Sequence, residues 1–119
     1  MDIIRIAEKF AGFSESWRPK IAAQANGQDI RLVKAEGLFP WHSHVDADEV
    51  FIVWKGQFEV HFRDRIVTMG PGEMIVVPRG VEHRTSGAGA EVMIFEPSEV
   101  INSGDADVSQ FTAPQGVHV

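Results

Sequence analysis

The stretch GLFPWHSHVDADEVFIVWKG, residues 37–56, decides the fold because it joins a histidine pair to an apolar run between two glycines. His42 and His44 are one residue apart, so on an extended chain both side chains point to the same side. Glu49 follows five residues later and introduces the apolar run 50–54, which is typical of a strand buried on both faces. We therefore expect a β-strand here, with polar side chains gathered just before it.

A second stretch, GEMIVVPRGVEHRTSG at residues 72–87, supplies another histidine, His83. Pro78 ends a strand ladder because it lacks an amide hydrogen, and Gly80 permits the turn that aims His83 inward. Imidazoles and a carboxylate that converge in this way suit one divalent transition metal, of which Fe, Mn, Ni and Zn are the main candidates. The predicted ligands are His42, His44, Glu49 and His83, with Asp46 and Asp48 as alternatives to Glu49.

The rest of the chain has the pattern of an all-β protein. Short apolar or alternating runs separated by glycine and proline predict strands at residues 30–35, 50–54, 58–62, 74–77 and 92–95. Only residues 3–10 have a helical period, with Asp2 as a possible cap and Gly12 as the end. This pattern predicts an antiparallel sandwich or barrel with a short N-terminal helix.

Composition limits the class of protein. A chain of 119 residues predicts a single domain, 1–119, with an irregular tail at about 104–119. The formal net charge of -6 argues against partners such as nucleic acid or an anionic membrane surface. The chain has no cysteine, no apolar run long enough to span a bilayer and no signal-peptide pattern, so we expect a cytoplasmic protein.

Together the two stretches resemble the motifs of the cupin family. Gly37, His42-Ser43-His44, Glu49 and Gly56 match the first motif, and Gly72, Pro78-Arg79-Gly80 and His83 match the second. The spacer 38–41 is one residue short, and Gly87 replaces the final asparagine, which is not a metal ligand in the family. The resemblance implies a double-stranded β-helix, or jelly-roll barrel, with Glu49 as the fourth ligand. Within the family, the chain most resembles small bacterial cupin-domain proteins of unassigned activity.

Other polar residues are weaker candidates for a functional role. His61 alternates with Phe58 and Val60, so it is predicted to face solvent or a partner subunit rather than the metal. Lys34 is a weak candidate for an acid or base, and an exposed role is favoured. The remaining candidates flank His83 or lie at the chain end, and surface roles are favoured for all of them: Arg79, Glu82, Arg84 and His118.

The tryptophans suggest self-association. Trp41 precedes His42, so it points away from the ligand side, and Trp54 lies in the following strand. A covered outer face, and hence a homodimer, explains such large apolar groups, and Trp17 is a possible third member of the cluster.

The expected function is that of a metal-binding small cupin that acts on or binds a small oxygen-rich organic molecule. A non-catalytic module that binds or senses a sugar or organic acid is the alternative, and no catalytic residue stands out. If the protein is an enzyme, dioxygenase, isomerase or lyase chemistry fits an open metal site.

Overall fold

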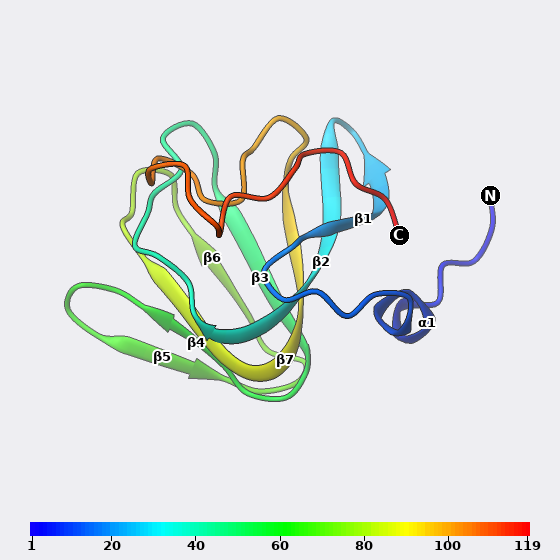
Figure 1. Ribbon diagram of the computed structural model, residues 1–119, viewed down its shortest axis with the longest axis horizontal. Helices are drawn as coiled ribbons and strands as arrows, with labels where there is room; N and C mark the ends of the chain where they lie inside the picture. Colours follow the sequence, from blue (N-terminus) through cyan, green and yellow to red (C-terminus); the bar gives the residue numbers. More distant parts are fainter.

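The structure, a computed structural model, describes residues 1–119 as one short helix followed by seven strands (Figure 1). The elements are α1 (Ile6–Ala11), β1 (Lys20–Ala25), β2 (Gln28–Leu38), β3 (Glu49–Lys55), β4 (Phe58–His61), β5 (Ile66–Met69), β6 (Met74–Val77) and β7 (Arg84–Pro97). All six ladders between these strands are antiparallel. The predicted all-β jelly-roll fold with an N-terminal helix is therefore confirmed.

Two long strands hold the barrel together. The main sheet has the order β1-β2-β7-β3-β6, and β4 joins β7 and β5 to form the opposite wall. β7 pairs with β4 through residues 84–87 and with β3 through residues 91–95, while β2 runs alongside both parts. The ladder between β2 and β7 shifts register between Ala35 and Glu36, and both strands curve from one wall into the other (Figure 1).

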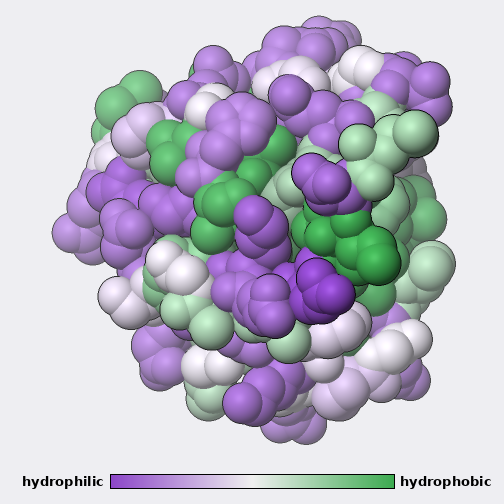
Figure 2. Space-filling model, turned by 90° about the vertical axis from the view of Figure 1, so that its right-hand side faces the viewer, coloured by the Kyte–Doolittle hydropathy of each residue, from purple (hydrophilic) through white to green (hydrophobic).

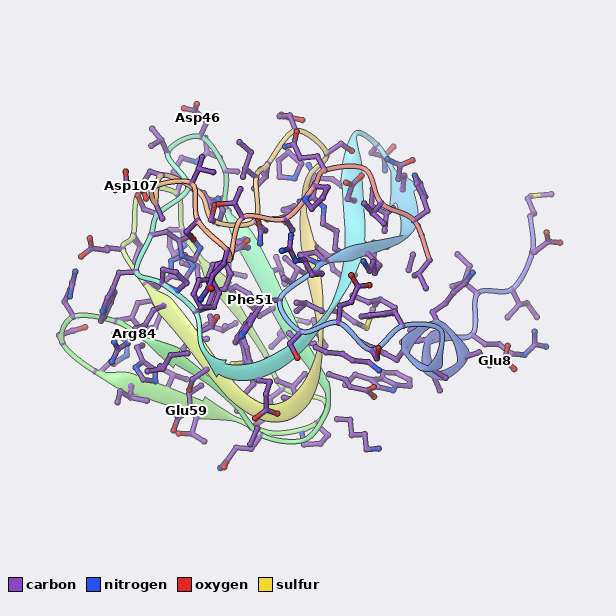
Figure 3. The ribbon with its side chains drawn as sticks, in the orientation of Figure 1. Glu8, Asp46, Phe51, Glu59, Arg84 and Asp107 are labelled. Carbon is purple, nitrogen blue, oxygen red and sulfur yellow. The ribbon has the colours of Figure 1, made fainter.

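The interior is filled by apolar side chains from both walls. Phe51 on β3 and Phe58 on β4 meet with ring centroids 5.5 Å apart, and Trp17 packs on Phe39 at 5.1 Å. Phe51 lies between the walls in Figure 3. β2 is buried on both faces because Val33 points inward while Leu32 packs outward beneath Phe10 of α1. The helix therefore covers part of the outer face of the main sheet.

The helix is shorter than the period predicts. It begins at Ile6 rather than near residue 3, its N-cap is Arg5, and no side chain caps it, so the prediction of an Asp2 cap is wrong. Ile3 is 77% exposed, whereas Phe10 is fully buried. Packing of Phe10 stabilises the last turn, and residues 1–5 have nothing comparable to bury.

Two glycines that look like turn residues in the sequence lie inside a strand instead. Gly87 and Gly89 belong to β7, and Gly87 pairs with Gly37 of β2 and Phe58 of β4. A Cβ on Gly87 would lie 2.8 Å from the carbonyl oxygen of Ala35 and 2.9 Å from its Cβ. Gly87 thus allows β2 and β7 to approach closely where the sheet bends. Strands β1 and β5 were not predicted, because β1 is rich in alanine and both strands are short.

This close approach predicts that Gly87→Ala destabilises the fold. The added methyl overlaps backbone atoms of Ala35 that cannot rotate away, so the free energy of unfolding is expected to fall by about 1–3 kcal/mol. Urea denaturation of both proteins measures the change. Gly70→Ala is the matched control, because its Cβ would meet only the flexible Glu73 carboxylate at 3.7 Å. Equal stabilities of the two variants would contradict this account.

The chain after β7 has no further helix or strand and crosses the upper end of the barrel, where it is coloured orange to red in Figure 1. The one helix has six residues, which is too few to cross a lipid bilayer.

Candidate metal centre

Two loops bring the predicted ligands together. His42 and His44 lie on the loop between β2 and β3, Glu49 is the first residue of β3, and His83 ends the loop between β6 and β7. His42 and His83 form an isolated antiparallel bridge, in which each amide donates to the carbonyl oxygen of the other at 2.9 Å. The amide of Gly80 also donates to the carbonyl oxygen of His44 at 2.9 Å. Backbone hydrogen bonds therefore fix one ligand loop against the other.

The four side chains converge on one point inside the barrel. One ligand atom from each of them lies within 4.8 Å of the others, and all four residues are buried. The Nδ1 of His42 lies 2.8 Å from the carbonyl oxygen of Pro40, and the Nδ1 of His83 lies 3.0 Å from that of Val81. A carbonyl oxygen can only accept a hydrogen bond, so both imidazoles carry their hydrogen on Nδ1 and present the Nε2 lone pair to the centre.

The ligand atoms of these side chains are arranged to bind a cation rather than to hydrogen-bond with one another. The Nε2 of His44 lies 3.2 Å from Glu49 Oε2, and the Nε2 of His83 lies 3.3 Å from Glu49 Oε1. His44 Nε2, His83 Nε2 and Glu49 Oε1 are buried without a hydrogen-bond partner. Facing lone pairs leave these atoms unsatisfied, which is costly in the interior. Bonds of about 2.1 Å to a shared ion place neighbouring ligand atoms about 3.0–3.4 Å apart, and both of these contacts fall in that range.

The aspartates that might replace Glu49 lie outside this group. Asp46 is exposed at the tip of the loop before β3 (Figure 3), and Asp48 accepts hydrogen bonds from Arg79 at the surface. Glu49, by contrast, is 3% exposed and touches two of the imidazoles. The geometry favours Glu49.

The charge state of the cluster follows from burial. Desolvation, reinforced by the neighbouring His83, lowers the pKa of His42 to about 4. Burial alone would raise the pKa of Glu49, but the imidazoles of His44 and His83 beside its oxygens, together with the neighbouring Glu96, outweigh burial and hold that pKa well below its usual range. A neutral imidazole and an ionised carboxylate are the forms that bind a metal.

The lowered pKa of His42 predicts acid sensitivity of the metal-free protein. The unfolded chain protonates this imidazole near pH 6.5 and the folded chain only near pH 4, so the unfolded state holds more protons between these values. The free energy of unfolding is therefore expected to fall by about 3 kcal/mol between pH 7 and pH 4 because of His42. Urea denaturation across this range, compared with His42→Asn, isolates the contribution. Parallel pH profiles for the two proteins would refute it.

Behind Glu49 lies a cluster of buried acidic and basic side chains that the sequence does not predict. Glu96 on β7 is 1% exposed and contacts Glu49, and Arg31 on β2 donates to Glu96 Oε1 at 2.8 Å and to Asp29 Oδ2 at 2.9 Å. Desolvation, followed by the charge of Glu49, raises the pKa of Glu96 well above its usual range. The one signal in the sequence is a glutamate placed between the apolar run 92–95 and Pro97, and this signal does not indicate which residue it contacts.

A small cavity adjoins the ligand atoms. His42 and Glu49 form one side of it, and aromatic rings form most of the rest. Thr85 and Asn102 supply its other polar side chains. The aromatic members are Trp17, Phe39, Phe51 and Phe58. The volume that the centre of a water molecule can occupy here is about 30 Å³, which suffices for one or two water molecules.

Residues 99–113 close this end of the barrel. Asn102 lines the cavity and holds the segment in place through hydrogen bonds to Phe111 and Ala113. Asp105 accepts from the amide and hydroxyl of Ser43, between the two histidine ligands, at 2.6 and 2.8 Å. Gly104 lies so close that a Cβ would overlap the Ser43 carbonyl oxygen. We call residues 99–113 the strap.

The structure places His61 away from the cluster but does not expose it. As predicted, it lies on the opposite side of β4 from Phe58 and Val60 and outside the ligand group, but only 7% of it is exposed, so solvent, the first of its two predicted surroundings, is wrong. Its Nε2 lies 3.0 Å from Glu59, and Arg84 donates to its Nδ1 at 3.1 Å. Glu59 and Arg84 are labelled on this wall in Figure 3. Neighbours in the same chain therefore cover His61.

The other weak candidates also have partners outside the cavity. Lys34 donates to the carbonyl oxygen of Phe13 at 2.6 Å, and His118 is exposed near the chain end. Glu82 pairs with Arg63 at the surface, and Arg63 in turn lies 3.7 Å over the ring of Trp41. Trp17 belongs to the interior, so it is not part of an outer cluster.

Comparisons with known proteins agree with this architecture. Residues 30–101, more than half of the chain, match the model of the cupin domain family. A curated relative, the uncharacterized protein YdbB of Bacillus subtilis (strain 168), is 33% identical over 81 residues. That alignment covers 67% of this chain and 66% of the relative, which is just under two thirds of its length.

Two solved structures are similar in both sequence and fold. A cupin-2 domain containing protein from Shewanella frigidimarina NCIMB 400 is 44% identical with a TM-score of 0.78, over 80% of this chain and 94% of that chain. Protein NMB1881 from Neisseria meningitidis is 32% identical with a TM-score of 0.74, over 82% of this chain and 100% of that chain. The fold, the motif spacing and these matches show that the chain belongs to the cupin domain family.

Proposed function

We propose that this cupin binds one divalent transition metal, Fe, Mn, Ni or Zn, and holds a small organic molecule against it through that molecule's oxygen atoms. The observation that carries the proposal is the convergence of four buried donor atoms within 4.8 Å, three of which have no hydrogen-bond partner. Four protein ligands leave one or two positions on a five- or six-coordinate ion, which then supplies Lewis-acid or redox chemistry.

The chain's own residues orient and shield the site. The carbonyl oxygens of Pro40 and Val81 fix the imidazoles of His42 and His83 so that Nε2 points to the centre. Aromatic side chains form most of the lining of the adjoining cavity, and only Thr85 and Asn102 offer further hydrogen bonds there. This lining favours a compact molecule that is polar mainly where it meets the metal. Asn102 of the strap also lines the cavity, so the strap helps to limit the size of the molecule that fits there.

A binding module without turnover is the second candidate. It is favoured by the absence of lysine, arginine or a further histidine from the cavity lining, since chemistry at a metal usually needs a placed acid or base. The cavity supplies only a hydroxyl and an amide beyond the metal ligands. The two candidates share the metal site and differ in whether the bound molecule is transformed.

Reconstitution separates the two candidates. The metal-free chain is loaded with Fe(II), Mn(II), Ni(II) or Zn(II) and incubated with a panel of small phenols, keto acids and sugars, with oxygen consumption and product masses as readouts. Turnover that is lost in His83→Gln supports the enzyme. Thermal stabilisation by one compound without turnover supports the binding module. Failure of the chain to bind any of these metals would overturn both.

We also propose a homodimer formed through the outer face of β3 and β6. Met74 and Val76 of β6 are 63% and 53% exposed, and they face Ile52 and Val50 of β3 across the ladder. Trp54, 41% exposed, continues this row along β3. A contiguous apolar face of this kind is typical of a subunit interface. Figure 2 shows a different side, the α1 end, where apolar residues lie in patches between polar ones.

Oligomeric state tests the homodimer directly. We expect the wild-type chain to sediment as a dimer at micromolar concentration and Val76→Lys to sediment as a monomer of unchanged secondary structure. Ile66→Lys is the matched control, because Ile66 is 58% exposed on β5, outside the proposed face. A monomeric wild-type chain would contradict the proposal.

A further inference from the structure

Strand register sets three carboxylates side by side within the barrel. Asp29 of β2 faces Glu96 of β7, and Val50 of β3 faces Phe95, so Glu49 comes level with Glu96 one step further along. All three are at most 3% exposed. Side chains directly opposite each other on neighbouring strands lie about 5 Å apart, and like charges in such positions destabilise a sheet. This arrangement persists only if other groups balance it.

Arg31 compensates the negative charge at one end of this row and fixes the position of Glu96. Its guanidinium donates to Asp29 and to Glu96 Oε1, and also to the carbonyl oxygens of Ser98 and Val100 at 2.8 and 2.7 Å. The guanidinium is thus fixed from several directions, and Oε1 of Glu96 is fixed with it. The other oxygen of Glu96, Oε2, is buried with no N–H donor beside it, and the Glu96 carboxyl group lies against that of Glu49. Two carboxyl oxygens attract each other only when they share a proton, so one proton is needed between these two groups.

We propose that Glu96 is a positioning residue for Glu49: anchored by Arg31 on one oxygen, it holds the Glu49 carboxylate toward the three imidazoles with the other. The inference rests on the proposed metal site and adds to it a residue that does not touch the metal. Groups that orient a metal ligand in this way are typically worth about 10–100-fold in metal affinity. Arg31 and Asp29 form the support behind Glu96.

Two substitutions of Glu96 separate contact from charge. Glu96→Gln has the same length, so its amide oxygen accepts from Arg31 while its N–H donates to Glu49. Glu96→Asp keeps a carboxylate but is one methylene shorter, so it cannot reach both partners. A positioning role predicts that E96Q binds metal like the wild type and that E96D binds about 10–100-fold more weakly. A role through charge alone predicts the reverse order.

The test is calorimetric titration of the metal-free variants with Ni(II) and Co(II), together with the visible spectrum of the Co(II) forms, which reports a change at Glu49. Glu96→Met replaces E96D if the shorter side chain prevents folding. Glu91→Gln on the same strand is the matched control, because Glu91 pairs with Lys34 away from the cluster. Weaker binding by E96Q than by E96D, or equal binding by all variants, would overturn the positioning role alone. No metal binding by the wild-type chain would overturn the metal site as well.

Discussion

Replacing His83 with glutamine is expected to abolish the stabilisation that a divalent metal gives this protein. His83 is fully buried, its Nε2 lies 3.3 Å from Glu49 Oε1, and it is the one ligand from the second loop. Without it, the remaining donors come from one side of the site. Metal at 1,000 times its dissociation constant stabilises the wild-type fold by about 4 kcal/mol, and this increment should vanish in the variant.

Thermal and urea unfolding with and without Ni(II) or Zn(II) measure this loss. His61→Gln is the matched control, because it removes another buried histidine that lies outside the ligand cluster. We expect the control to keep the full metal-dependent increment even if its metal-free stability is lower. A metal response in His83→Gln equal to that of the wild type would remove His83 from the site.

The second large effect is expected from Arg31→Met. Arg31 is 4% exposed and donates to two buried carboxylates, so its removal leaves Asp29 and Glu96 without a cationic partner. Breaking a buried ion pair by removing one partner costs about 3–5 kcal/mol. Urea denaturation of the metal-free protein at pH 7 tests this figure.

Arg63→Met provides the comparison for Arg31→Met. Arg63 pairs with Glu82, but the two side chains are 61% and 51% exposed. Solvent screens such a pair, so its loss should cost less than about 1 kcal/mol. If the two variants are equally stable, the buried row of charges does not contribute to the fold as we describe.

The candidate ligands could be predicted from the sequence because short segments determine their directions. His42 and His44 share one loop, and Pro78 and Gly80 fix the turn that precedes His83. Gly80 has a φ of 78°, which glycine adopts without strain. Backbone demands of this kind are visible in a single sequence.

Glu96 and Arg31 could not be found in this way. Their contact depends on the register between β2 and β7, which brings together two residues that are 65 positions apart in the sequence. The same limit explains Gly87, which looks like a turn residue until the approach of β2 is known. Likewise, the start of α1 depends on what Phe10 packs against, and no local pattern records that.

The sharing of β7 among three partner strands has a consequence for how the molecule opens. Its backbone is hydrogen-bonded to β2, β3 and β4, so neither wall can detach while the other stays intact. Amide protons near Val92 should therefore exchange with deuterated solvent only when the whole chain unfolds, whereas those of residues 1–5 should exchange within the dead time. The barrel would then melt as one cooperative unit, with its amino-terminal arm fraying independently.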